Sequence, residues 1–240
     1  MSDAPVLPVG DEKRVMVESM FDGVAPRYDR LNRIISLGLD QGWRRRTVAT
    51  LGLPAGSRVI DLACGTGDLC DDVRAAGYRP FGFDVSAGML AVAHTNAPLV
   101  RSDVLVLPLP DTSVDGVTCG FALRNFVDLP TFFTECARVL RPGGRIAALD
   151  AAEPENPLMR IGNSVWFRGI VPWIGARFSD NPAAYRYLPA STAYLPAGPA
   201  LMDQVRAAGF SAVGRRTMMG GSVQLLTATR AETSSGEAGA

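Results

Sequence analysis

The segment from Val59 to Leu69, VIDLACGTGDL, constrains the fold of this chain more than any other segment. Its apolar start is typical of a short buried strand, the glycines at Gly65 and Gly67 are typical of a tight turn, and a helical pattern follows. Because glycine has no Cβ, a ligand can approach the backbone of such a turn closely. The first N–H groups of the following helix also lack partners within the helix. The segment therefore predicts a strand–turn–helix unit that suits a bound ligand.

Strand-like and helix-like segments alternate through the middle of the chain. The expected strands are residues 58–63, 79–84, 99–103, 115–120 and 145–149, and the expected helices are residues 69–76, 87–94 and 129–140. A helix at 201–208 and an antiparallel pair of strands at 213–217 and 222–229 follow. This order predicts an α/β fold: a Rossmann-like, doubly wound sheet of seven strands, mostly parallel, with an antiparallel closing strand.

The rest of the chain suggests additions to one domain rather than further domains. Residues 1–240 fit a single domain, because no linker divides them. Residues 11–53 are expected to form an N-terminal helical cover. Residues 156–195 are aromatic and interrupted by prolines, and we expect an inserted lid on the acceptor side. Residues 231–240 are small and polar, so a disordered tail is expected.

Composition excludes several classes of function. The 24 basic and 24 acidic residues balance, which gives no basic footprint for nucleic acid. The single histidine, His94, excludes a multi-histidine metal site, and no metal is expected. The four cysteines form no CxxC pair and indicate buried thiols in a reducing compartment. With no secretory signal and no apolar run of membrane-spanning length, a cytoplasmic protein is expected. Oligomeric state is not indicated.

Acidic residues at the ends of the first two strands indicate the kind of ligand. Asp61 ends the first strand, where it can meet an amino-bearing group. Asp84 ends the second, where a carboxylate can accept hydrogen bonds from both ribose hydroxyls. Such residues place a nucleoside at the C-terminal edge of the sheet. The alternative is a strand–helix turn without a ligand, and the agreement of loop, acids and strand order favours a bound nucleoside.

NAD and S-adenosylmethionine are the two cofactors to compare. In the dinucleotide fingerprint GxGxxG/A the third small residue matters, and Cys70 stands there in this chain. Asp61 would repel a pyrophosphate but suits a methionyl ammonium group. The run from Asp61 to Gly67 resembles the glycine loop D-x-x-x-G-x-G of class I S-adenosylmethionine-dependent methyltransferases. That resemblance implies that S-adenosylmethionine contacts Gly65, Thr66 and Gly67. It further implies that Asp103 meets the adenine amino group and that Val104 contacts the adenine ring.

Longer segments resemble the ubiquinone/menaquinone biosynthesis C-methyltransferase family. They are Met20–Asp22, Tyr28–Asn32, Ser36 with Trp43–Arg44, Phe121–Asn125, Arg138–Arg145, Tyr185–Ser191, Ala208–Phe210 and Gly220–Gly221. The resemblance runs from about residue 17 to about residue 230. It implies a methyltransferase that methylates the ring of a demethylmenaquinol or a related polyprenyl quinol. The expected partner is thus a prenylated quinol.

The resemblance places candidate acceptor residues in two regions. Arg124 and Asn125 are the candidate catalytic pair: the guanidinium would stabilise a developing phenolate, and Asn125 would orient the same oxygen. The alternative for this pair is a salt bridge and a helix cap. Tyr28, Asp29 and Tyr185 are expected on the acceptor side. A base, if one is needed, is Asp29, Asp150 or water, and the residues do not choose among them.

Departures from the family pattern lie on the acceptor side. Asp40 stands where the family has His, Gly120 and Ala152 stand where it has Ser, and Asp150 stands where it has Glu. Another aromatic or lipidic acceptor, or a cofactor-binding relative without catalysis, are therefore the alternatives. Apolar and basic residues around Trp166 and Trp173 would also suit peripheral contact with the inner face of a membrane.

Overall fold

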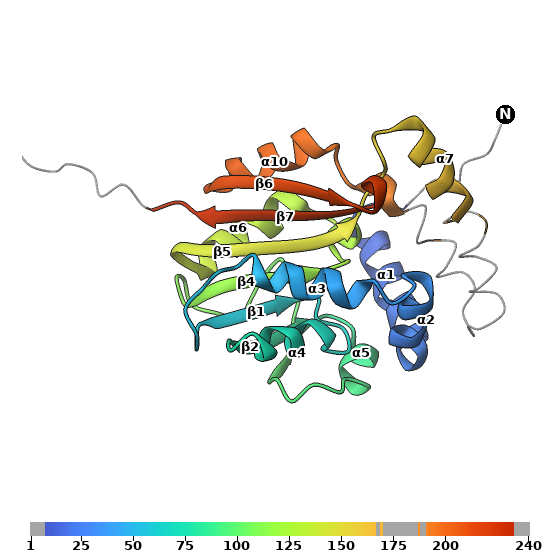
Figure 1. The fold of residues 1–240 in the computed structure, drawn as a ribbon. Helices are drawn as coiled ribbons and strands as arrows, with labels where there is room; N and C mark the ends of the chain where they lie inside the picture. The colour runs from blue at the N-terminus through green and yellow to red at the C-terminus, as the bar shows by residue number, and fades with distance from the viewer. Residues whose placement is uncertain (1–7, 167–168, 170–186, 188–190, 233–240) are drawn as a thin grey trace, which may run out of the picture.

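The computed structural model describes residues 8–166, 169, 187 and 191–232, and its centre is one seven-stranded sheet (Figure 1). The strand order is β3-β2-β1-β4-β5-β7-β6. The strands are β1 (Arg58–Leu62), β2 (Arg79–Asp84), β3 (Leu99–Arg101), β4 (Val114–Gly120), β5 (Leu140–Ala151), β6 (Phe210–Met218) and β7 (Val223–Arg230). The first five strands pair in parallel, and β7 runs antiparallel to both of its neighbours. The expected doubly wound sheet with an antiparallel closing strand is confirmed.

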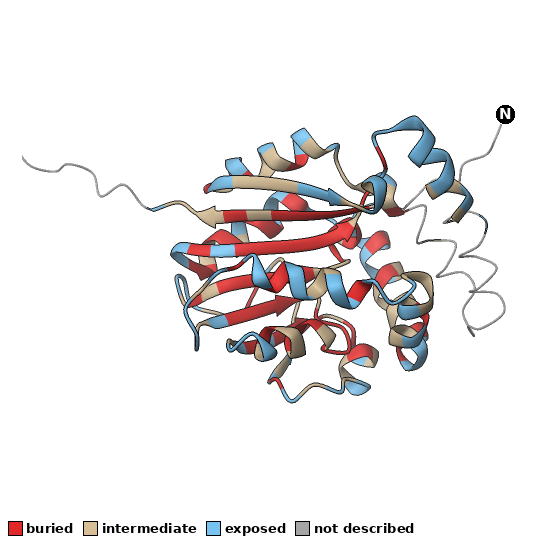
Figure 2. Ribbon diagram, viewed as in Figure 1, coloured by how far each residue is buried: buried red, intermediate tan, exposed pale blue. Residues whose placement is uncertain are grey.

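Helices cover both faces of the sheet. They are α3 (Asp40–Ala49) and α4 (Asp68–Ala75) on one face, and α6 (Leu129–Val139) and α10 (Gly198–Ala207) on the other. Successive side chains of a strand point to opposite faces. Ile60 and Leu62 of β1 accordingly pack in one cluster of buried residues, whereas Val59 packs in the other with α3 and α4. This alternation explains why β1 and β4, at the centre of the sheet, are buried along nearly their whole length (Figure 2).

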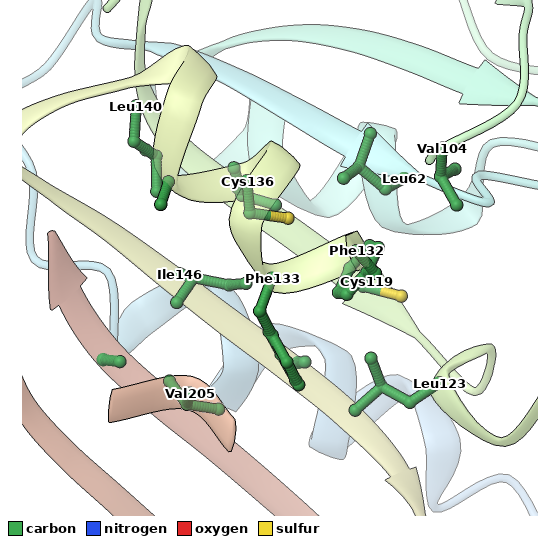
Figure 3. Close-up of a cluster of buried hydrophobic side chains, with 14 of the residues drawn as sticks. Leu62, Val104, Cys119, Leu123, Phe132, Phe133, Cys136, Leu140, Ile146 and Val205 are labelled. Atoms are coloured by element: carbon green, nitrogen blue, oxygen red, sulfur yellow. The ribbon is translucent and has the colours of Figure 1, made fainter. Parts of the chain in front are cut away.

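The larger cluster lies under α6 and α10 (Figure 3). Phe132, Phe133 and Cys136 of α6 are fully buried against strand residues such as Ile146. Val205 of α10 belongs to the same cluster. Asp128 begins α6 by accepting a hydrogen bond from the N–H of Thr131 at 3.0 Å. The cluster holds the carboxyl ends of β4 and β5 in place, where the functional residues lie.

An N-terminal group of helices crosses the carboxyl ends of the strands (Figure 1). It consists of α1 (Gly10–Val24), the short 3-10 helix η1 (Ala25–Arg27) and α2 (Tyr28–Ile35), followed by α3. We call α1, η1 and α2 the cover. Val24 and Leu31 form its own small buried cluster, and α1 packs against α5 (Ala87–Ala91).

Some sequence expectations fall partly or wholly outside the described residues. Of the expected lid at 156–195, the structure describes α7 (Pro157–Val165) and the 3-10 helix η4 (Thr192–Tyr194) among few others. Tyr185 and most of the tail at 231–240 lie outside the described residues. Two further 3-10 helices are η2 (Leu123–Asn125), after β4, and η5 (Met219–Gly221), between β6 and β7. Among the described residues, no helix combines the length and the apolar character that crossing a bilayer requires.

Candidate functional site

The turn after β1 has the backbone of a ligand-binding loop. Ala63, Gly65 and Gly67 all have positive φ, of 54°, 56° and 93°. The turn thus contains an alanine in the left-handed backbone conformation before its two glycines. The N–H of Gly67 donates to the carbonyl of Cys64 at 3.0 Å, which closes the turn directly before α4. Gly65 is itself buried, and Ala63 and Gly65 both line a cavity at the edge of the sheet.

Asp84 lies beside this turn, lines the same cavity and is held in one orientation. Its two carboxylate oxygens accept hydrogen bonds from the N–H groups of Gly65 at 2.7 Å and Ser86 at 2.8 Å. Burial raises the pKa of Asp84, whereas the backbone donors lower it. A carboxylate oxygen has more than one lone pair, so each oxygen retains capacity for a ligand hydroxyl.

The cavity brings together several residues predicted from the sequence. Gly65, Asp84, Asp103 and Val104 all line it. Asp103 accepts a hydrogen bond from the N–H of Leu105 at 2.9 Å, which fixes the loop after β3. Apolar side chains dominate the rest of this wall: Val17, Phe21, Val85, Met89, Leu105 and Phe126. Such a slot, apolar with carboxylates at its edges, fits an adenine ring and a ribose.

Asp61 occupies a different position from these residues. It is buried at the end of β1, below the turn, and it is not among the residues that line the cavity. Thr118 donates to one of its oxygens at 2.9 Å, and the thiol of Cys70 lies 3.6 Å from the other. Burial raises the pKa of Asp61 to about 7. Its contact with a methionyl ammonium group stays a prediction.

Thr66 connects the turn to the cover. Its hydroxyl donates to Asp29 of α2 at 2.7 Å. Asp29, expected on the acceptor side, is not among the residues that line either cavity described here. In the structure its contact is with the glycine turn, so α2 is fastened to the residues that form the floor of the first cavity.

A second, larger cavity of about 570 Å³ lies beside the first. Small-molecule sites commonly range from about 300 to about 1,000 Å³, so this volume suits an aromatic acceptor with part of a side chain. Apolar residues from α1, α2, α3, α7 and β7 or next to them line it, among them Val24, Ile35, Trp43, Leu158, Met159, Trp166 and Val223. Arg124 and Asn125 contribute polar groups to its wall.

The two cavities share four residues, Phe21, Tyr28, Phe121 and Asn125. They come from α1, α2, the end of β4 and η2, which are far apart in the sequence. Phe121 has a positive φ of 58°, a backbone conformation that costs free energy for a bulky residue. Any group that passes from a ligand in one cavity to a ligand in the other must cross this junction.

Arg124 shows features of both roles expected for it. It is buried, and its guanidinium pairs with Asp150, while its Nε donates to Ser191 at 3.2 Å. This is the salt bridge of the structural alternative. The residue also lines the second cavity, as the catalytic role requires. Asp150 accepts from the backbone N–H groups of Arg124 at 3.0 Å and Ala151 at 2.7 Å as well, so both of its oxygens are already engaged, and it is not among the residues that line either cavity, which places it poorly to act as a base.

Asn125 is oriented by a tyrosine that the sequence reasoning did not single out. The hydroxyl of Tyr187 donates to Oδ1 of Asn125 at 3.2 Å, which leaves the amide N–H groups of Asn125 as donors. Tyr187 also lines the second cavity. The tyrosine-containing stretch at 185–191 was the available signal, since Tyr185, Tyr187 and Ser191 belong to it.

Asp40, one of the departures from the family pattern, also lines the second cavity. It is buried, accepts a hydrogen bond from the hydroxyl of Ser36 at 2.7 Å and pairs with Arg44 at 2.5 Å. Arg44 in turn reaches Asp68 at 3.0 Å and Asp72 at 3.1 Å on α4. Asp40 therefore belongs to an ion network that fastens α3 to α4.

Comparison with known proteins identifies the family of this chain. The model of the ubiE/COQ5 methyltransferase family matches residues 8–230. A demethylmenaquinone methyltransferase of Roseiflexus castenholzii is 41% identical over 217 residues, which cover 87% of this chain and 90% of that protein. One of Thermus thermophilus is 42% identical over 201 residues, covering 80% of this chain and 91% of that protein.

Solved structures show the same fold at low sequence identity. Phosphoethanolamine N-methyltransferase 2 of Haemonchus contortus, in complex with S-adenosyl-L-methionine, superimposes with a TM-score of 0.62 at 14% identity. The match covers 80% of this chain and 53% of that one. The chain therefore belongs to the ubiE/COQ5 methyltransferase family, which confirms the enzyme class expected from its glycine turn and its longer signatures.

Proposed function

We propose that this enzyme transfers a methyl group from S-adenosylmethionine to a ring carbon of demethylmenaquinol or a related polyprenyl quinol. The named activity of its relatives supports this acceptor. The observation that carries the proposal is the pair of adjoining cavities that share Phe21, Tyr28, Phe121 and Asn125. One cavity has carboxylates suited to a nucleoside, and the other is large, apolar and equipped with a guanidinium.

The first cavity fits S-adenosylmethionine. Asp84 would accept the ribose hydroxyls, Asp103 would accept the adenine amino group, and Val104 would contact the ring. Gly65 would lie against the ligand, because its positive φ and missing side chain leave the turn open. When bound, S-adenosylmethionine supplies an activated methyl group on a sulfonium sulfur. Because the methyl group is already activated, much of the catalysis is expected to come from positioning.

The second cavity would hold the quinol. Arg124 cannot act as a base at neutral pH, because a guanidinium stays charged, but it stabilises negative charge on a ring oxygen. Its pairing with Asp150 and Ser191 holds the guanidinium in place before the acceptor binds. Asn125 would donate to the same oxygen, since Tyr187 occupies its carbonyl. The quinol hydroxyl would release its proton to water, as Asp150 is already engaged, and the methylated ring carbon would then lose its own hydrogen as a proton while the ring oxygen is protonated again.

The mouth of the second cavity suggests how a prenylated acceptor would arrive. Leu158 and Met159 of α7, Leu37 and Met219 line the cavity and are themselves exposed, from 48% for Met159 to 71% for Leu158. Ile161 and Val165 of α7 are exposed as well, and Figure 2 shows this helix exposed along most of its length. These side chains would lie against the inner face of a membrane, so that the tail stays in lipid while the ring enters the cavity.

The test is methyl transfer from isotopically labelled S-adenosylmethionine with purified enzyme. Three reduced acceptors are compared: a short-tailed demethylmenaquinol, a demethylated polyprenyl benzoquinol and a catechol without a tail. We expect C-methylation of the naphthoquinol with the highest kcat/KM. Methylation of the catechol oxygen alone, or no labelled product from any acceptor despite binding of S-adenosylhomocysteine, would contradict the proposal.

A further inference from the structure

Asp22, at the surface of α1, contacts the turn after β2 at the point where α5 begins. Its Oδ1 accepts two hydrogen bonds, from the hydroxyl of Ser86 at 2.5 Å and from the N–H of Gly88 at 2.9 Å. These contacts join residues that lie 64 and 66 positions apart in the sequence. They therefore connect the cover to the segment that directly follows Asp84, the last residue of β2.

Ser86 lies between two carboxylates. Its N–H donates to Oδ1 of Asp84 at 2.8 Å, and its hydroxyl donates to Asp22. The hydroxyl oxygen also accepts the N–H of Met89 at 3.0 Å. A serine has only one O–H, so its orientation is determined once Asp22 takes the proton. Asp22 thus steadies the residue whose N–H orients the carboxylate of Asp84.

Gly88 allows this approach because it has no side chain. A Cβ built on Gly88 would lie 2.9 Å from both Cα and Oδ1 of Asp22. Because one of these atoms belongs to the backbone of α1, the clash would not be relieved by a rotamer change. Any larger residue at position 88 would have to push α1 away from the turn.

The position of α1 determines the width of the first cavity. Val17, Glu18 and Phe21 of α1 contribute one part of its wall, and Asp84 of β2 and Met89 of α5 contribute another. Asp22 directly follows Phe21, so its contact with the turn after β2 sets the separation of these two parts. Glu18 adds a more exposed contact, an ion pair with Arg101 at 2.9 Å.

We infer that Asp22 is a positioning residue for the methyl donor: through Ser86 it orients Asp84, and with Gly88 it closes α1 over the nucleoside. The inference rests on the proposed function, because it takes S-adenosylmethionine as the occupant of the cavity. The donor enters and leaves when this contact opens. Asp22 therefore governs donor affinity and residence time, and it leaves the rate of transfer in the closed complex unchanged.

The test uses three variants and a matched control. Asp22→Ala removes both acceptor contacts, Gly88→Ala leaves Asp22 intact but forces α1 away, and Asp22→Asn keeps an oxygen that still accepts both hydrogen bonds. Gly42→Ala is the control, because position 42 is helical and has open space around it. Calorimetry gives the affinity for S-adenosylhomocysteine, stopped-flow displacement gives its dissociation rate, and assays at saturating donor give kcat.

We expect Asp22→Ala and Gly88→Ala each to weaken S-adenosylhomocysteine binding about tenfold, mainly through faster dissociation. Asp22→Asn should stay within about threefold of the wild type, Gly42→Ala should match it, and kcat at saturating donor should change less than about twofold. Melting curves without ligand establish that the variants are folded. Should Asp22→Ala fail to fold, the affinity of Gly88→Ala for S-adenosylhomocysteine tests the inference by itself.

Three results would overturn the inference. They are unchanged affinity in Gly88→Ala, a loss in Asp22→Asn as large as in Asp22→Ala, or a fall in kcat without a change in affinity. If the wild type itself does not bind S-adenosylhomocysteine, the proposed function fails, which is a distinguishable outcome.

Discussion

At the scale of the residue, the pair of Arg124 and Asp150 links the stability of the site to its chemistry. Both side chains are buried, and removal of one partner from such a pair leaves an uncompensated charge. A loss of activity in Arg124→Ala would therefore combine unfolding with the loss of a functional group. A substitution that keeps the positive charge separates the two effects.

We predict that Arg124→Lys folds but loses at least about tenfold in kcat, because an ammonium group cannot reproduce the planar guanidinium geometry. Arg124→Ala should lose about 3–5 kcal/mol of unfolding free energy. Urea denaturation and assays with saturating quinol provide the measurements. Arg141→Ala is the control, since Arg141 pairs with Asp115 near the surface and such pairs contribute at most about 1 kcal/mol. Wild-type turnover in Arg124→Lys would contradict the assigned role.

Asp61 makes stability depend on pH. Burial raises its pKa from 3.8 to about 7, so the folded state holds this proton more tightly than the unfolded state. The contribution of this tightly held proton on Asp61 to the free energy of unfolding is complete below about pH 4, and it is lost as the pH rises toward 7. In the variant Asp61→Asn, the amide side chain would stay neutral at every pH in this range.

We predict that the stability of Asp61→Asn relative to the wild type rises by about 2 kcal/mol between pH 5 and pH 7.5. Chemical denaturation at the two pH values, without ligand, measures the difference. A difference that is the same at both pH values would show that Asp61 does not titrate in this range.

At the scale of the element, Gly67 joins the turn to α4. Its φ of 93° is unfavourable for other residues, and an added Cβ would lie 2.3 Å from Cγ2 of Thr95. Thr95 is not free to rotate, because its hydroxyl donates to Asp71 at 2.6 Å and accepts from Arg74 at 2.9 Å. The turn and the segment before β3 are therefore packed in direct contact.

We predict that Gly67→Ala destabilises the protein by about 3 kcal/mol, the combined effect of backbone strain and the clash. Gly143→Ala is the matched control: φ is 77° there, but nothing lies within 4 Å of the added Cβ. It should lose about 1 kcal/mol, the cost of the backbone conformation alone. Equal losses of unfolding free energy in the two variants, measured by urea denaturation, would show that the contact with Thr95 does not destabilise Gly67→Ala.

At the scale of the whole molecule, the exposed apolar residues of α7 lie next to the mouth of the second cavity. Ile161 and Val165 are 63% and 60% exposed, and neither lines the cavity. They therefore offer a way to test contact with lipid without altering the site itself.

We predict that the double substitution Ile161→Gln, Val165→Gln reduces binding to lipid vesicles at least about fivefold, because buried apolar area drives such binding. Activity toward a short-tailed quinol in detergent-free buffer should be unchanged. Val106→Gln, at a position 75% exposed outside both cavities, is the control. Unchanged vesicle binding by the double variant would exclude α7 as the contact.

Much of the fold could be predicted from the sequence, because strands and helices leave a local periodic pattern. The predicted first and last residues of the strands and helices were less accurate than their order. The strand expected at 145–149 begins at Leu140, since Leu140 already pairs with Val114 before the irregular stretch that contains Gly143. That pairing is a contact with another strand, and no local pattern marks it.

By itself, the sequence determined the strand–turn–helix unit from Val59 to Leu69 and the alternation behind a doubly wound sheet, because both depend on neighbouring residues. Only the tertiary structure decided that Phe21, Tyr28, Phe121 and Asn125 meet between two cavities. Likewise, only the fold pairs Asp22 with Ser86 and Arg124 with Asp150. These contacts join residues far apart along the chain, and they form only when the sheet brings the carboxyl ends of its strands together.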